Sequence, residues 1–288
     1  TEICRSVIRS KRRFTYGEAL AILDSLEGRD VPAGDLPPDR ADYEPILERM
    51  AFLRDCLKDA RTRRGALFLD LPQLKIRVGE NGQIESVDRE QGDPAHSLIE
   101  EFMLAANETV ARYLQDQGLS TLARVHPAPS EEKLADFREM LQALGLDLRP
   151  RPEVNDLQKL VDKVAGGPLA VTVQVGLLRT MGHAEYTAQP GLHFALSTTT
   201  YCHFTSPIRR YSDLLVHRAL IRGGGFGGDG LRDEEADNLV ATCEHISSTE
   251  RRAMVAERDA NDRYMAAFMA EHTGAKFEAR VNGVTRAG

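Results

Sequence analysis

The sequence of 288 residues has no tryptophan, and no apolar run approaches the roughly 18 residues needed to cross a bilayer. Its first twenty residues, TEICRSVIRSKRRFTYGEAL, are basic but are not followed by the apolar stretch of a secretory signal peptide. Neither a membrane span nor a signal peptide is therefore indicated. We expect a cytoplasmic protein.

Cysteine is also scarce, with Cys4, Cys56, Cys202 and Cys243 scattered along the chain. No two of them have the C-x-x-C spacing that is typical of zinc sites. The same scatter argues against a disulfide framework. We expect four plain thiols.

An excess of positive charge is missing, because the formal net charge at pH 7 is -7. Proteins that coat nucleic acid without specificity depend on many exposed lysine and arginine contacts with phosphates. That function class is excluded by the sign of the charge. Any nucleic-acid site in this chain must be local.

Periodicity predicts a chain that is mostly helical, with a few short strands. Apolar residues at helical spacing predict helices at 16–26, 43–57, 97–118, 130–145, 154–167 and 233–271. Alternating apolar residues around Asn81 and Gly82 predict a hairpin between 65 and 87, and strands are expected near 121–129 and 191–201. The segment AVTVQVGLLRT, residues 170–180, fits either a strand or a buried helix.

The stretch HFTSPIRRY, residues 203–211, places two adjacent arginines at a predicted helix start. Ser206 is predicted as the N-cap and Pro207 as the first helical residue. The N-terminal end of a helix carries about half a positive charge, so a cation in its first turn costs about 0.3–1 kcal/mol. The pattern therefore predicts an anionic group opposite Arg209 and Arg210.

Two explanations of these arginines remain open from the residues alone. In the first, Arg209 forms an ion pair with Asp213 one turn later, and Arg210 faces solvent. In the second, the free N–H groups of the helix start, the hydroxyls of Thr205 and Ser206, and a guanidinium together bind phosphate. The backbone of an oligonucleotide would satisfy all three.

The segment HFALSTTTYCHFTSPIRRYSDLLVHRAL resembles the signature segment of the ribonuclease II / ribonuclease R family, the RNB-domain exoribonucleases. That signature reads HFGL and then Y-x-H-F-T-S-P-I-R-R-Y-x-D-L-x-x-H-R. Further blocks resemble the same family in the same order, from about Arg5 to Phe277: VIRSKRRFTYGEALAIL, RGALFLDLP, AHSLIEEFMLAANETVARYL, RVHPAPSEEKL and MVAERDAN.

The resemblance implies an α+β fold. It implies a helix-rich RNB-type catalytic domain in which a mixed or antiparallel sheet forms an RNA channel, and it favours a helix at 170–180. The implied activity is processive 3′ to 5′ hydrolysis of single-stranded RNA to nucleoside 5′-monophosphates, with two Mg²⁺ ions at the bottom of the channel. Such a channel would be a narrow basic funnel inside a protein whose outer surface stays acidic.

The resemblance also assigns roles to the HFTSPIRRY residues. Arg209 is the implied catalytic residue, which contacts the scissile phosphate and stabilises charge developing in the transition state. The implied supports of the phosphate backbone are Arg210, Tyr211, Thr205 and Ser206.

Three further RNA-binding residues are implied outside that segment. Glu100 matches a glutamate that contacts the ribose of the terminal nucleotide, where the 2′-hydroxyl distinguishes RNA from DNA. Glu257 matches another ribose-contacting acid, with a surface role in a charged helix as the alternative. Phe68, beside Leu69 on the opposite face of a predicted strand, is the candidate for an aromatic that clamps the terminal bases.

The largest departure from the family pattern is the absence of its metal-binding motif. The family's metal-binding carboxylates come from a D-x-D-D type run, which this sequence lacks; its nearest acidic cluster, Asp233–Asp237, fits a solvated helix start. Mg²⁺ prefers oxygen ligands, so we expect His126, His193, His203 and His217 to be hydrogen-bonded structural residues. We therefore predict no metal ligand in this chain. The expected partner is an N-terminal carboxylate-bearing part, in cis or as a second chain.

We expect an RNB-like exoribonuclease domain at 1–272 that lacks its carboxylate segment, and the truncated start of an OB-fold RNA-binding domain at 273–288. Two functions remain. The first is an exoribonuclease that degrades single-stranded RNA when joined to the metal-binding part. The alternative is a non-catalytic RNA-binding or regulatory protein with an RNB-like fold.

Overall fold

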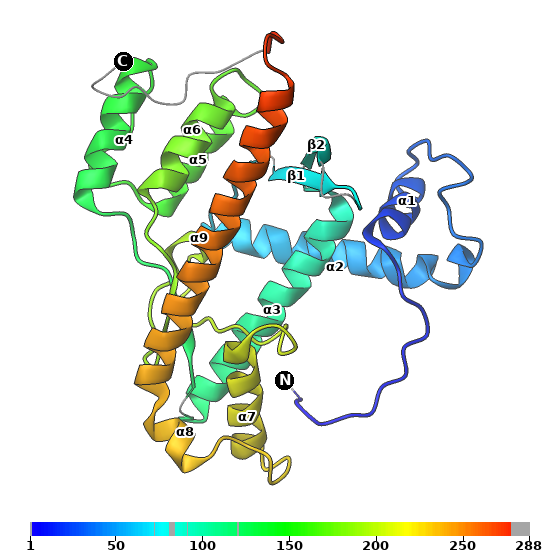
Figure 1. Cartoon of the computed structure of the whole chain (residues 1–288). Helices are drawn as coiled ribbons and strands as arrows, with labels where there is room; N and C mark the ends of the chain where they lie inside the picture. The colour runs from blue at the N-terminus through cyan, green and yellow to red at the C-terminus, as the bar shows by residue number, and fades with distance from the viewer. Residues whose placement is uncertain (1, 72, 81–83, 91, 120, 278–288) are drawn as a thin grey trace.

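The computed structural model describes residues 2–71, 73–80, 84–90, 92–119 and 121–277 (Figure 1). The predicted Asn81-Gly82 turn and most of the predicted OB-fold start lie outside these residues. Within the described ranges, no helix is long and apolar enough to cross a membrane.

The N-terminal part folds as two helices joined by a proline-rich loop. Helix α1 spans Tyr16–Leu26, a short 3-10 turn spans Arg40–Asp42, and α2 spans Glu44–Arg64. A capping box starts α1, because the Thr15 hydroxyl accepts the Glu18 N–H and the Glu18 carboxylate accepts the Thr15 N–H. Both predicted helices are confirmed, and α2 extends about two turns further than its apolar pattern indicated.

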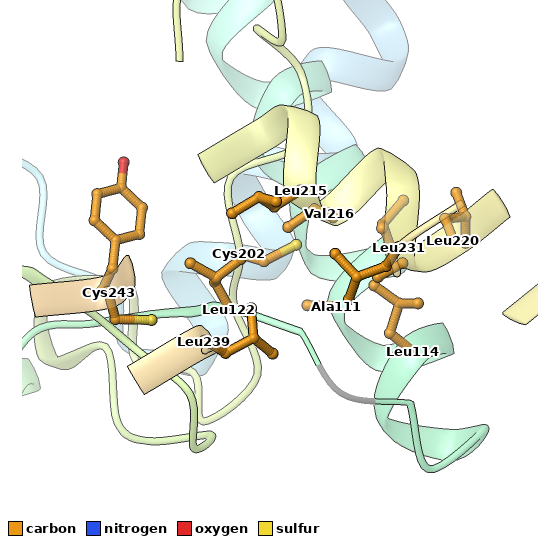
Figure 2. Packing of buried hydrophobic residues seen from close by; sticks show 13 residues of the cluster. Ala111, Leu114, Leu122, Cys202, Leu215, Val216, Leu220, Leu231, Leu239 and Cys243 are labelled. Atoms are coloured by element: carbon orange, nitrogen blue, oxygen red, sulfur yellow. The ribbon is translucent and has the colours of Figure 1, made fainter. Parts of the chain in front are cut away.

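Helix α3, Pro94–Asp116, joins two hydrophobic cores. Its first turns place Ala95 and Leu98 against α1 and α2. Its last turns place Val110 and Leu114 in a second core with α7, Tyr211–Gly224. The side chains of this second core converge from α3, from α7 and from the segments that carry Leu122 and Cys202 (Figure 2). The amphipathic stripe of α3 therefore fixes the distance between these two cores.

A third core holds the middle of the chain. It is formed by α4 (Glu131–Ala143), α5 (Val154–Val164) and α6 (Ala170–Thr180). Leu67, which follows α2, and Phe194 are buried in the same core. The helix at 170–180 is thus confirmed, and the Ser130 hydroxyl caps α4.

The strands form two small antiparallel sheets. Strand β1 (Gln73–Val78) pairs with β2 (Ile84–Glu90), and β3 (Ala123–Val125) pairs with β4 (Glu185–Thr187). The predicted strand at 191–201 is wrong, because this segment contains a 3-10 turn at Phe194–Leu196. His193 closes that turn by exchanging backbone hydrogen bonds with Thr198, at N···O distances of 2.7 and 3.4 Å.

The C-terminal part is a long helix that runs beside the other elements (Figure 1). The predicted helix at 233–271 is interrupted at Asn238, which separates α8 (Asp233–Asp237) from α9 (Leu239–Glu271). Leu239 and Cys243 anchor the start of α9 in the core with α3 and α7. Beyond residue 250, α9 is almost entirely exposed.

Candidate functional site

The HFTSPIRRY segment ends in a turn, and the helix after it starts later than predicted. Helix α7 begins at Tyr211 with Arg210 as its N-cap, so the prediction of Ser206 as N-cap and Pro207 as first helical residue is wrong. The Ser206 carbonyl instead accepts the backbone N–H groups of Arg209 and Arg210 at 3.3 and 3.0 Å. Residues 206–210 therefore form a tight turn that leads into the N-terminal end of α7.

Buried Asp213 holds this turn in place. Its side chain is fully buried and accepts the Ser206 N–H at 2.7 Å, the Arg210 guanidinium at 2.7 Å and the Ser212 hydroxyl at 3.0 Å. A carboxylate in the first turn of a helix also complements the helix dipole. One buried acid thus satisfies a cation, a hydroxyl and a turn N–H that would otherwise lack a partner.

The ion pair of this turn involves the other arginine from the one that the first sequence explanation proposed. Arg210, not Arg209, forms the ion pair with Asp213. Arg209 is exposed, and its side chain forms no hydrogen bond or ion pair with another residue of the described ranges. Its neighbours Ile208 and Tyr211 are also exposed. The turn therefore presents one free guanidinium beside the N–H groups of a helix start.

Helix α3 fixes the segment on the other side of the turn. The Asn107 side chain accepts the Phe204 N–H at 2.9 Å and donates to the Tyr201 hydroxyl at 3.0 Å. The Phe204 ring stacks on His217 of α7, with ring centroids 4.1 Å apart. Residues 201–204 are thus held between α3 and α7.

Four histidines lie in or near the same segment, one buried (His126) and three half-buried, and most are hydrogen-bonded as predicted. His126 contacts the Gly182 carbonyl, His203 contacts the Tyr186 hydroxyl, and His217 contacts the Phe204 carbonyl, at 2.8–3.0 Å. The prediction is wrong for the Nδ1 atom of His193, which is buried without a partner in the described structure. Burial lowers the pKa of His193 to about 4 and that of His203 to about 3.

The lowered pKa values of His193 and His203 predict that the folded protein loses stability in acid. Both pKa values are lower in the folded protein than the ordinary value of 6.5, so the unfolded chain binds more protons below that pH. The free energy of unfolding should therefore decrease as the pH falls from about 6.5 to about 4. Urea titrations at several pH values measure this slope. His203→Gln should make the decrease in the free energy of unfolding with falling pH shallower. An unchanged slope in that variant would show that His203 does not cause the loss of stability in acid.

A second feature is a cavity of about 1250 Å³ between α2, the first turns of α3, α5 and α6. Phe68, Leu69 and Glu100 line it, together with Arg61 and Glu101. The expectation that Phe68 and Leu69 lie on opposite faces of a strand is wrong, because residues 66–70 form no strand. Two backbone N–H groups of this segment are bound instead by side chains, with Gln158 accepting from Phe68 and Gln174 accepting from Asp70.

The wall of this cavity is not basic. It carries seven Asp or Glu side chains and five Lys or Arg side chains. The basic funnel implied by the resemblance is therefore not found here. Selective contacts, rather than an overall positive potential, must recognise whatever enters the cavity.

The cavity and the turn lie along one helix. Glu100 and Asn107 are seven residues apart on α3, which places them on nearly the same face and about 10 Å apart along the axis. Glu100 reaches the cavity, and Asn107 binds the segment that leads to Arg209. In a comparison with known proteins, residues 1–223 match the family model described as RNB domain.

The chain belongs to the RNB domain family. It is 36% identical to ribonuclease R of Aquifex aeolicus over 295 aligned residues, which cover the whole chain and 40% of that relative. It is 34% identical to ribonuclease R of Escherichia coli, with 97% of this chain and 35% of that relative aligned. The chain thus spans about 40% or less of the length of these relatives.

Solved structures agree with this assignment of the RNB chain. Mycoplasma genitalium RNase R in complex with ribose methylated single-stranded RNA is 28% identical, with a TM-score of 0.83, and the match covers 96% of this chain and 43% of that one. The helix-rich architecture with small antiparallel sheets is therefore that of an RNB domain.

Glu257 does not lie with the other predicted RNA-binding residues of this RNB chain. It lies in the exposed part of α9, does not line the cavity, and has no ion pair with the described residues. Its predicted contact with ribose stays a prediction.

The acidic residues that the structure describes in this RNB chain do not fit a two-metal site. The described residues include no group of three or more His, Cys, Asp or Glu side chains placed to hold an ion. In the 233–237 cluster, Asp233 is paired with Arg222 and Glu235 with Arg218 and Arg232. Two of the four acids at this helix start are thus already paired with arginines.

Sequence reasoning missed Asn107 and the Arg61–Glu101 pair. Asn107 sits within a helical stripe of mostly apolar residues, and a buried amide there is a signal that it has a specific partner. Arg61 and Glu101 carried no such signal, because both lie in charged stretches typical of solvated helix faces.

Proposed function

We propose that this RNB chain is the RNA-gripping part of a 3′ to 5′ exoribonuclease, which hydrolyses single-stranded RNA processively to nucleoside 5′-monophosphates. Arg209 contacts the scissile phosphate and is the catalytic residue of this chain. Arg210, Tyr211, Thr205 and Ser206 support the phosphate backbone. Glu100 contacts the ribose of the terminal nucleotide, Phe68 stacks on its base, and Glu257 is a further ribose contact.

The observation that carries the proposal is the exposed Arg209 at the start of α7. Its neighbours in the turn are fixed by Asp213, so the guanidinium is held on a rigid support. The Thr205 hydroxyl and the Arg210 Nε–H are buried without a partner in the described structure. An anionic oxygen at this turn would supply the acceptor that these groups lack.

The arrangement of the site also supports an RNA strand as the ligand. Phe68 and Glu100 share one cavity, and a strand that runs along α3 from there would pass the turn of Arg209. Aromatic rings bind bases by stacking, and carboxylates accept hydrogen bonds from the ribose 2′-hydroxyl. The solved RNase R relative with single-stranded RNA supports the same ligand class.

We place the two Mg²⁺ ions on a carboxylate-bearing N-terminal part, supplied in cis or as a second chain. Two-metal hydrolysis needs anionic oxygens that hold the ions about 4 Å apart. The described residues do not provide such a group, so the roles assigned here concern binding and transition-state charge only. We further propose residues 1–272 as the RNB-like domain, 273–288 as the beginning of an OB-fold, and the cytoplasm as the location.

The deciding experiment is degradation of a 5′-labelled single-stranded RNA with Mg²⁺. The chain is assayed with and without the carboxylate-bearing part. We expect shortening from the 3′ end to a small limit product only when both parts are present. RNA that stays intact in both reactions would overturn the proposal, and binding without degradation would favour the non-catalytic alternative.

A further inference from the structure

A buried ion pair with two unpartnered polar atoms lies at the wall of the cavity. Arg61 of α2 and Glu101 of α3 are 7% and 2% exposed, and their nearest N and O atoms are 2.5 Å apart. The Arg61 Nε and the second Glu101 oxygen are both buried and have no partner among the described residues. Burial raises the pKa of Glu101, with Arg61 opposing that shift.

Such a pair is poor evidence for a purely structural role. A buried ion pair whose remaining polar atoms are unsatisfied is often no more stable than apolar residues of the same size. Its presence at a cavity wall calls for another explanation. The other contacts of Arg61 provide one.

Arg61 contacts both of the residues proposed to hold the terminal nucleotide. The centre of its guanidinium lies 4.7 Å from the centroid of the Phe68 ring, and its nearest nitrogen lies 3.7 Å from a Glu100 oxygen. A guanidinium over an aromatic face fixes the plane of the ring. Glu100 is mostly exposed, and Arg61 is its one ion-pair partner within the described ranges.

The backbone explains how Phe68 reaches Arg61. Gly65 ends α2 with a positive φ of 89°, and the Ala66 N–H returns to the Arg61 carbonyl at 3.0 Å. A side chain at Gly65 would also collide with Asn155, 2.5 Å from the position of its Cβ. The chain therefore reverses directly after α2 and brings Phe68 back over the guanidinium.

We propose that Arg61, anchored by Glu101, is a positioning residue that orients Phe68 and Glu100 toward the 3′-terminal nucleotide and so sets the preference for a terminal ribose over a deoxyribose. The inference rests on the proposed function of this site. Arg61 itself touches neither substrate nor reacting atoms. It acts by restricting two side chains that would otherwise sample several rotamers.

The test compares binding of two oligonucleotides to the chain joined to its carboxylate-bearing part. Both are single-stranded RNA, and one ends in a 2′-deoxynucleotide. Affinities are measured by fluorescence anisotropy in EDTA, so that the readout needs no turnover. Loss of a hydrogen bond to a charged group is expected to make the wild type bind the ribose end about tenfold more tightly.

The decisive variant is Arg61→Met with Glu101→Gln, which removes both buried charges together and so avoids leaving one uncompensated. We expect its preference for the ribose end to fall to about twofold or less, because the fixed hydrogen bond is lost. The matched control is Arg64→Met with Glu108→Gln, an Arg–Glu pair on the same two helices that does not line the cavity. It should keep the wild-type preference.

Each outcome decides the inference. An unchanged preference in the Arg61/Glu101 variant overturns it, and so does a wild type that binds both ends equally. If thermal unfolding shows that this variant does not fold, Arg61→Lys retains the cation but not the flat face, and its preference should still fall. Failure of the proposed function would appear separately, as wild-type protein that prefers the ribose end but does not degrade RNA with Mg²⁺.

Discussion

Arg209→Ala is expected to lower turnover of single-stranded RNA by about 10²–10³-fold in the chain joined to its carboxylate-bearing part. The guanidinium is the free charge of the turn, and its proposed contact strengthens as negative charge develops on the scissile phosphate. RNA affinity should weaken far less, because most phosphate contacts remain. Single-turnover rates and anisotropy measured on the same protein separate the two effects.

Two companion variants sharpen this prediction. Arg209→Lys keeps the charge but loses the two-pronged hydrogen bond, so we expect an intermediate rate. Arg151→Ala removes an arginine that is also exposed but lies far away in the sequence, between α4 and α5, and should leave turnover unchanged. Equal losses of binding and turnover in Arg209→Ala would mean that this residue only anchors RNA.

Asp213→Ala is expected to destabilise the protein by about 3–5 kcal/mol, because it removes one partner of a buried ion pair. Arg210 would be left without its anion, and the Ser206 N–H and Ser212 hydroxyl would lose their acceptor. The turn of Arg209 should loosen as well. Urea unfolding gives the change in the free energy of unfolding directly.

The control for Asp213 is an exposed acid in a similar ion pair. Asp233 lies 2.6 Å from Arg222, but its side chain is 85% exposed. Exposed pairs contribute about 0–1 kcal/mol, so Asp233→Ala should shift the urea midpoint little. A comparably small effect of Asp213→Ala would show that the turn is held by other contacts.

The helices were largely predictable from the sequence, because their apolar spacing and caps act locally. Ser130, Thr15 and the stripe of α3 each behave as local rules require. The start of α7 was not predictable in this way. Ser206 and Pro207 are a favourable local start, but Asp213, seven residues later and fully buried, binds the Ser206 N–H and shifts the start to Tyr211.

The residues of the candidate site likewise divide into those that the sequence indicated and those that only the structure revealed. Motif resemblance indicated Arg209, Glu100 and Phe68, and the structure adds what connects them. Asn107 and Arg61 were not evident, because their partners lie on other elements, 40 or more residues away in sequence. Polar contacts over such separations leave no periodicity in the sequence.

The central claim is that the turn at 206–210 faces the bound RNA strand. Ile208 is fully exposed beside Arg209, so Ile208→Cys provides a probe at this position, and the exposed natural thiol of Cys4 provides an internal reference. The measurement is the rate of alkylation of both thiols, with and without a saturating single-stranded oligoribonucleotide. The account predicts that RNA slows alkylation at position 208 and leaves Cys4 unchanged. RNA that binds while position 208 reacts at its original rate would contradict it.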